Sequence, residues 1–158
     1  MPPRKPIPVV PVYWTRPMTF EALAEYEDRQ SDRLYAVVGR YRHGGTGRDA
    51  LRTLFYIGTT RQFIYERLAR PEHKIWQVEE DHGHAWQILT RVGAIVPEHL
   101  SRLSKQLVLE VEAAQIFHHE PPFNVRNVNS YFTRPMVVEN WTRSGKGAVP
   151  ELKHRFEA

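Results

Sequence analysis

The 158-residue chain contains no cysteine, and this absence excludes several kinds of chemistry. Without thiols there is no disulfide framework, no thiolate-bound zinc or iron–sulfur cluster, and no cysteine nucleophile. Long apolar runs are also missing, because no stretch approaches the roughly 18 consecutive apolar residues that a membrane-spanning helix needs. The N-terminal residues lack the uninterrupted apolar core of a signal peptide. We therefore expect an intracellular, cytoplasmic protein with no membrane contact.

Charge is unevenly distributed along the chain, although the net charge is only +4. Residues 29–70 carry nine arginines against three carboxylates, whereas residues 71–120 carry four basic and eight acidic residues. Arginine is well suited to planar, bidentate contact with phosphate. A basic block followed by an acidic one indicates a polyanionic partner such as nucleic acid, with a solvated basic surface as the alternative.

Proline marks the expected organisation of the chain. Six of the twelve prolines lie in residues 1–17, which we interpret as an extended, proline-rich N-terminal arm. The arm is either disordered or lies along the domain through its apolar residues. We expect residues 18–139 to form a single domain. Residues 140–158 are polar and basic, and we expect them to form a C-terminal tail outside this domain.

Hydrophobic patterning predicts an α+β fold with a small, mainly antiparallel three-stranded sheet flanked by helices. Strands are expected at about residues 34–38, 53–58 and 86–96, the first two joined by a glycine-rich loop. Thr19 is a candidate cap for a short helix, and residues 62–69 form a second helix. The strongest helical signal begins at Pro97 and ends near His118 or His119. Its buried stripe consists of Leu100, Leu103, Leu107, Val111 and Ala114.

Four segments between residues 33 and 126 carry the strongest functional signal. The first expected strand bears Tyr35, and the second bears a Tyr-Ile-Gly triplet at residues 56–58, followed by the hydroxyl residue Thr59. A helical arginine, Arg67, lies eleven residues after the tyrosine of the triplet. A Pro-Pro-Phe-Asn sequence follows the long expected helix and ends at Asn124. Glu112 lies twelve residues before this asparagine. In order and spacing these segments resemble the GIY-YIG nuclease family.

The resemblance implies a metal-dependent DNA endonuclease that hydrolyses phosphodiester bonds. Tyr35 is then the expected general base, and Tyr56 positions the water or the phosphate, although the roles of the two tyrosines are exchangeable. Arg67 binds phosphate oxygens, and Glu112 holds one Mg²⁺ or Mn²⁺ ion. A free phenol titrates near pH 10, so the base needs positive charge nearby to act at neutral pH.

The remaining site residues have supporting roles under the same resemblance. Asn124 is expected to order the site through backbone hydrogen bonds, and His73 to assist near Arg67. Glu110 is the alternative to Glu112 as metal ligand, and two neighbouring arginines are alternatives to Arg67. The candidates for DNA contact are Arg40, Arg42, Arg48, Arg52, Arg61, Arg70, Arg126 and Arg134, of which Arg61 and Arg70 are those two alternatives.

Departures from the family pattern leave other functions open. Arg33 stands where the family has its first glycine, and the catalytic arginine is displaced by one residue. These features favour the main alternative, a non-catalytic nucleic-acid-binding module that keeps the nuclease fold. A third hypothesis is an interaction domain that uses the proline-rich arm as a ligand for an aromatic groove. The chain is compatible with a homodimer, and its sequence does not specify a DNA target.

Overall fold

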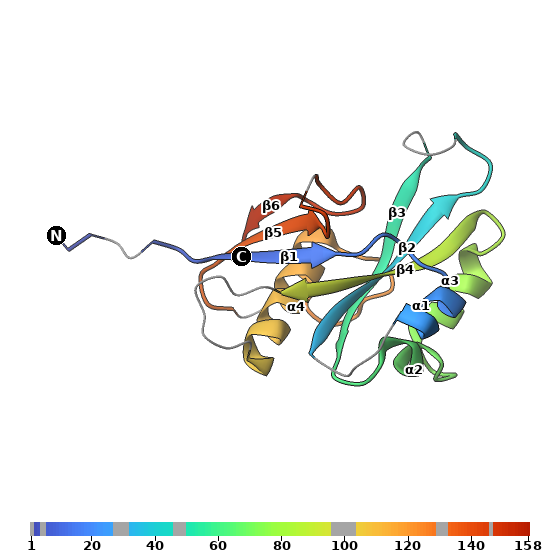
Figure 1. Cartoon of the computed structure of the whole chain (residues 1–158), viewed down its shortest axis with the longest axis horizontal. Helices are drawn as coiled ribbons and strands as arrows, with labels where there is room; N and C mark the ends of the chain where they lie inside the picture. Colours follow the sequence, from blue (N-terminus) through green and yellow to red (C-terminus); the bar gives the residue numbers. More distant parts are fainter. Residues whose placement is uncertain are drawn as a thin grey trace.

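The computed structural model describes residues 2–3, 6–26, 32–45, 50–95, 104–128, 133–145 and 147–158. Within these ranges a six-stranded mixed sheet carries four helices (Figure 1). The strands are β1 (Val9–Trp14), β2 (Arg33–Tyr41), β3 (Arg52–Thr60), β4 (Trp86–Ile95), β5 (Val137–Thr142) and β6 (Arg155–Glu157). The helices are α1 (Phe20–Tyr26), α2 (Ile64–Leu68), α3 (Lys74–His82) and α4 (Lys105–His119).

The order of strands across the sheet is β3-β2-β4-β1-β5-β6. Every neighbouring pair is antiparallel except β1 and β5, which are parallel. The three predicted strands coincide with β3, β2 and β4, which lie next to one another as an antiparallel unit. The prediction of a small three-stranded sheet is nevertheless wrong, because β1, β5 and β6 extend that unit to six strands.

The added strands come from the two segments that were expected to lie outside the domain. β1 occupies the proline-rich arm, where Val10, Val12 and Trp14 alternate into the core. Its pairing with β4 involves residues 12–14, beyond Pro11, whose ring nitrogen has no hydrogen to donate. Because residues 9–14 are a strand inside the sheet, they are not available as an extended ligand for another protein.

The C-terminal residues are also part of the sheet rather than a trailing tail. β5 and β6 lie there, and Phe156 is buried. Asn140 is fully buried and its side-chain oxygen accepts a hydrogen bond of 2.9 Å from the indole of Trp14. A buried amide of this kind stabilises the fold only while its partners are in place, so this contact ties the C-terminal segment to β1.

Apolar residues pack on both faces of the β3-β2-β4 unit. Even-numbered residues of β2, such as Leu34 and Ala36, face α4, whereas Tyr35 and Val37 face the layer of α1, α2 and α3. On α4, Leu107, Val111 and Ala114 are buried as the stripe predicts. The rest of that predicted helix, with Pro97, Leu100 and Leu103, lies outside the described residues.

The helices differ from expectation mainly at α3. α1 and α2 lie where the sequence predicts them, and the Thr19 hydroxyl accepts a hydrogen bond of 3.1 Å from the Ala22 amide. α3 was not predicted, because only Ile75 and Val78 of its nine residues are buried and the rest are mostly polar. None of the described helices is long and apolar enough to cross a lipid bilayer.

Candidate active site

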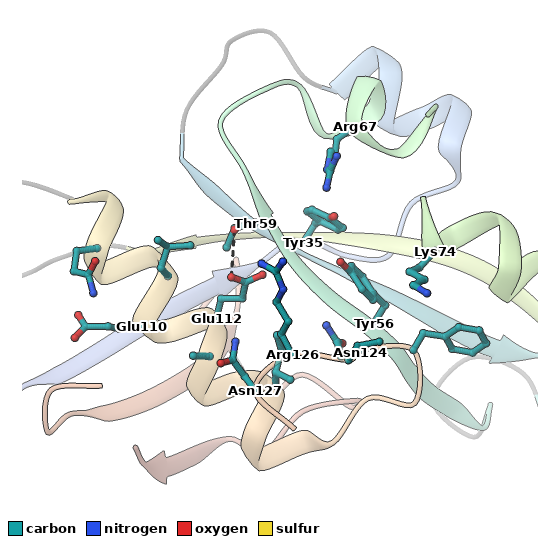
Figure 2. A pocket seen from close by; sticks show the side chains of 16 residues that line it. Tyr35, Tyr56, Thr59, Arg67, Lys74, Glu110, Glu112, Asn124, Arg126 and Asn127 are labelled. Atoms are coloured by element: carbon teal, nitrogen blue, oxygen red, sulfur yellow. Dashed lines mark hydrogen bonds between the residues drawn. The ribbon is translucent and has the colours of Figure 1, made fainter. Parts of the chain in front are cut away.

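A cavity of about 770 Å³ lies where the edge strand β3 meets α2, α3 and α4 (Figure 2). β3 is the outermost strand of the sheet, so side chains from both sheet faces can reach one space around it. The lining residues are Tyr35, Tyr56, Thr59, Arg67, Lys74, Gln106, Leu109, Glu110, Glu112, Ala113, Ile116, Phe123, Asn124, Val125, Arg126 and Asn127. Tyr35, Tyr56, Arg67, Glu112 and Asn124, which are far apart in sequence, are therefore brought together.

Three aromatic rings form a cluster at one side of the cavity. Tyr35 on β2 and Tyr56 on β3 point to the same sheet face, and their ring centroids are 6.1 Å apart. His73 caps α3, and its ring centroid lies 5.7 Å from that of Tyr35 and 5.5 Å from that of Tyr56. The Tyr35 hydroxyl and His73 Nε2 are hydrogen-bonded at 2.8 Å. His73 thus contacts the tyrosine pair directly.

The hydrogen bonds of His73 define where its proton lies. Nδ1 accepts the backbone N–H of Ile75 at 3.0 Å, so it carries no hydrogen. Burial and the positive charge of Arg67 lower the pKa of His73 to about 4, which keeps the ring neutral at pH 7. A neutral ring with a bare Nδ1 carries its hydrogen on Nε2. His73 therefore donates to the Tyr35 oxygen and does not accept its proton.

The two phenols differ in exposure. Burial raises the pKa of Tyr35, which is only 1% exposed, and negative charge on Tyr56 raises it further. Burial and the nearby Glu112 carboxylate raise the pKa of Tyr56, which is only partly buried. The Arg67 guanidinium lowers the pKa of both phenols.

Of the three candidate arginines, Arg67 is the one that lines the cavity with both tyrosines and Glu112. It extends from α2 toward Tyr35 (Figure 2). Arg61 instead forms an ion pair with Asp32, with Nε 3.0 Å from Oδ1. Arg70 donates to the side-chain oxygen of Gln62 at 3.0 Å. The geometry favours Arg67 for contact with a phosphate in this cavity.

The two candidate carboxylates have different surroundings although they lie two residues apart on α4. Glu112 faces the cavity, where the Thr59 hydroxyl donates to its Oε2 at 3.4 Å. Glu110 borders the cavity, but its carboxylate receives the backbone N–H of Arg134 at 3.1 Å and the Nη2 of Arg134 at 2.8 Å. Glu110 is thus compensated by Arg134, and Glu112 is the carboxylate that faces the tyrosines.

Asn124 holds the segment after α4 against the edge of β3. Its Oδ1 accepts the backbone N–H of Ile57 at 2.9 Å, and its Nδ2 donates to the carbonyl of the same residue at 2.8 Å. The backbone N–H of Phe123 donates to the Phe55 carbonyl at 3.0 Å. An edge strand presents unpaired backbone groups of this kind, and Asn124 satisfies them. This is the backbone role expected from the sequence, and it fixes Arg126 at the cavity.

Gly58 allows the Tyr35 ring to lie directly against β3. The two residues are opposite each other in the β2–β3 register. A Cβ atom at position 58 would lie 2.5 Å from the Tyr35 hydroxyl oxygen, closer than real Cβ contacts allow. The glycine of the Tyr-Ile-Gly triplet is therefore required by close packing.

Replacing Gly58 with alanine should displace Tyr35 from His73. We expect a loss of about 1–3 kcal/mol in the free energy of unfolding, the usual cost of an extra methyl group in a packed core. Gly147→Ala is the matched control, because nothing lies within 4 Å of a Cβ built at that position. Urea unfolding of both variants measures the difference, and equal stability of the two would contradict the packing argument.

The other arginines proposed for DNA contact lie in several places. Arg126 lines the cavity, and its charge lowers the pKa of Glu112. Arg40 and Arg52 are paired in the β2–β3 register. Arg40 lies five residues along β2 from Tyr35, which is about 17 Å at 3.4 Å per residue. Arg42 donates to the Gly83 carbonyl at 3.0 Å, and Arg52 lies 3.9 Å from a carboxylate oxygen of Glu151. Arg48 lies outside the described residues.

Lys74 and Asn127 are cavity residues that sequence reasoning did not select. Lys74 is the first residue of α3, a helix that the sequence pattern does not reveal. Asn127 follows the Pro-Pro-Phe-Asn sequence and adopts a positive φ of 63°. Thr59 was noted as part of the motif, but its contact with Glu112 requires knowledge of how α4 packs. For Lys74, Asn127 and Thr59 alike, the sequence offered one indication of a place in the cavity, which is their proximity to the motif residues.

The donor set around Glu112 fits a weakly held, hard divalent cation. The described residues contain no group of three or more histidine, aspartate or glutamate side chains that would enclose a metal. Mg²⁺ commonly binds proteins through one or two carboxylates, retains several waters and takes its other ligands from substrate phosphates. Glu112 and the hydroxyl of Thr59 are oxygen donors of the type this ion prefers.

Glu112 gives the metal-free protein a specific pH dependence of stability. Burial raises the pKa of Glu112 to about 7, from an ordinary value of 4.5, against opposing effects of Thr59 and Arg126. Between these values the folded protein keeps a proton that the unfolded chain has lost, so stability falls as the pH rises. Glu112→Gln removes this titration. In EDTA, the two proteins should have similar melting temperatures near pH 5, and the variant should melt at the higher temperature at pH 8.

Thermal unfolding at pH 5, 6, 7 and 8 measures this difference, with Glu80→Gln on the exposed face of α3 as the control. A melting-temperature difference between wild type and Glu112→Gln that does not change with pH would contradict the burial of this carboxylate.

Comparison of the chain with models of known protein families, with curated proteins and with solved structures finds no match.

Proposed function

We propose that the protein is a metal-dependent nuclease that hydrolyses phosphodiester bonds in DNA. The observation that carries this proposal is the arrangement of Tyr35, Tyr56, Arg67 and Glu112 around one cavity. These are the residues that the resemblance to GIY-YIG nucleases selects. Phosphodiester hydrolysis needs a proton acceptor, positive charge at the phosphate and a stabilised leaving oxygen, and this group of side chains can supply all three.

Positive charge in the cavity comes from Arg67, Lys74 and Arg126. They extend from α2, from α3 and from the segment after α4, so they surround the space from different sides. A guanidinium can bind two phosphate oxygens at once, whereas an ammonium acts as a point charge. We assign Arg67 to the scissile phosphate and Arg126 and Lys74 to the flanking backbone of the DNA.

The tyrosine pair supplies the proton acceptor. The buried Tyr35 hydroxyl is hydrogen-bonded to His73, so its oxygen is already engaged within the protein. Tyr56 is also the more exposed of the two phenols. Of the two arrangements that the sequence left open, these contacts favour Tyr56 beside the attacking water and Tyr35 behind it.

Mg²⁺ or Mn²⁺ is the proposed cofactor, with Glu112 as the protein ligand. When bound, such an ion polarises the phosphate oxygens and lowers the pKa of a coordinated water. Thr59 orients the carboxylate, because its hydroxyl donates to Oε2. Arg126 extends toward the Glu112 carboxylate and keeps part of the cavity positively charged when Glu112 is ionised (Figure 2).

The proposal is tested by incubating the full chain with supercoiled plasmid DNA and Mg²⁺ or Mn²⁺. Nicked or linear product should form with either ion and should be absent in EDTA. The absence of product with both ions, from protein that shows a cooperative unfolding transition, would contradict the nuclease proposal.

The main alternative is a nucleic-acid-binding module without catalysis. The observation that favours it is the burial of Tyr35, which raises the pKa of its phenol and makes ionisation difficult. Such a module would bind DNA with a steep salt dependence and would leave plasmid intact in the same assay.

A further inference from the structure

A second cavity of about 380 Å³ adjoins the candidate active site. It lies between the end of β3, α2 and the beginning of α4, and it shares Thr59, Arg67 and Leu109 with the larger cavity. Arg67 therefore borders both spaces. A guanidinium has five N–H donors, so one side chain can contact groups on either side.

Positive charge predominates among the described residues that line the second cavity. Arg61, Arg67, Arg70 and Lys105 contribute four positive charges against the one carboxylate of Asp32, which leaves a net charge of +3. Asp32 pairs with Arg61 at 3.0 Å, and Gln62 accepts a hydrogen bond from Arg70. The cations come from α2, its flanking loops and α4, and so surround the space from two sides. This charge and these donors suit a phosphate group.

An apolar side chain lies where the two cavities join. Leu109 on α4 is 40% exposed, although it is large and apolar, and it lines both cavities. A nucleic-acid strand alternates phosphates with apolar sugar and base surfaces. Leu109 between two cationic cavities matches this alternation.

We infer that the second cavity binds the phosphodiester adjacent to the scissile one on the same strand. The inference rests on the proposed function of the first cavity. The substrate is then a polynucleotide strand that crosses the end of β3, with Arg67 between two successive phosphates and Leu109 against the intervening nucleoside. Esters with a single phosphodiester occupy only the first cavity.

The test is the combined replacement of Arg70 and Lys105 by glutamine. Two substrates are compared in Mn²⁺: a labelled oligothymidylate, and thymidine 5′-(p-nitrophenyl phosphate), which has one phosphodiester. The ratio of kcat/KM for the oligonucleotide to kcat/KM for the ester should fall about tenfold or more, as expected when charge-assisted bonds are lost. An unchanged ratio would overturn the inference.

Arg155→Gln is the matched control, because Arg155 is an exposed arginine on β6, at the opposite edge of the sheet from β3. It should leave the ratio at the wild-type value. A double variant with Arg70→Lys and Lys105→Arg, which retains both charges, should recover most of the ratio. A fall in the ratio of equal size in the Arg155 control would also overturn the inference.

Binding without catalysis separates failure of this inference from failure of the proposed function. Fluorescence anisotropy with the same oligothymidylate in EDTA gives the dependence of log K on log salt concentration. The magnitude of this negative slope should become smaller by about 0.7 for each phosphate-contacting cation that is removed. A wild-type protein that cuts neither substrate would refute the nuclease proposal. The salt dependence of binding would still test whether the second cavity binds a phosphate. An unchanged slope in the glutamine variant would refute that inference.

Discussion

Replacing Glu112 with glutamine should abolish divalent-dependent cleavage of DNA. Of the two glutamates that border the cavity, Glu112 is the one that faces the tyrosines, while Glu110 is held by Arg134. Glutamine has nearly the same shape but no charge, so it binds a hard cation much more weakly. A metal ion contributes several kcal/mol to stabilising charge in the transition state, which corresponds to a rate loss of about 10³ or more. Single-turnover nicking of plasmid DNA in Mg²⁺ measures this loss.

The fold should survive the Glu112→Gln replacement. Because burial already favours the neutral carboxyl, a neutral amide fits the same surroundings, and the variant should be at least as stable as wild type at pH 8. Glu80→Gln should cleave at the wild-type rate. Full activity of Glu112→Gln in both Mg²⁺ and Mn²⁺ would show that this residue is not the ligand.

Replacing Arg67 with glutamine should reduce the rate of cleavage by about 10² to 10³, the usual effect of removing one preorganised donor from a developing negative charge. Among the cations that the structure describes, Arg67 is the one that borders both cavities and lowers the pKa of both phenols. The loss should appear mainly in kcat, because the charge at the phosphate grows in the transition state. Steady-state kinetics on the oligothymidylate measure it.

The neighbouring arginines separate this role from general attraction of DNA. Arg61→Gln and Arg70→Gln should show smaller losses that appear mainly in KM, since these side chains lie beside the second cavity and pair with Asp32 and Gln62. Arg155→Gln should have no effect. Equal effects of all these replacements would contradict a specific role for Arg67.

The antiparallel β3-β2-β4 unit could be predicted from sequence because its signals are local. Runs of apolar and β-branched residues mark the strands, and glycines mark the loop between the first two. The register was not predicted and comes from the structure, where Tyr35 and Gly58 lie opposite each other. Order and spacing of the motif residues were also sufficient to select side chains that border one cavity, although their roles remain a proposal.

The complete sheet could not be predicted because its other strands depend on contacts between distant segments. β1 contains Pro11, which normally argues against a strand, and its partner β5 begins 123 residues after β1 ends. β6 has only three residues, of which one is buried. Each of these strands is stabilised mainly by its neighbours in the sheet, and a short segment carries little information about such partners.

The choice between Glu110 and Glu112 shows a similar limit within the site. Both residues lie on the flanks of the apolar stripe of α4, so helical periodicity does not separate them. The distinction arises from Arg134, which follows α4 in the chain and reaches back to Glu110. An ion pair across 24 residues depends on how the intervening chain folds. The spacing to Asn124 was the signal in the sequence that favoured Glu112.

The most direct test of the central claim is a crystal structure of the Tyr56→Phe variant with an oligonucleotide and Mn²⁺, measured for anomalous scattering. We expect an anomalous peak at the Glu112 carboxylate and a backbone phosphate bound between it and the Arg67 guanidinium. An anomalous peak at another surface, or DNA bound away from the cavity at the edge of β3, would contradict the account.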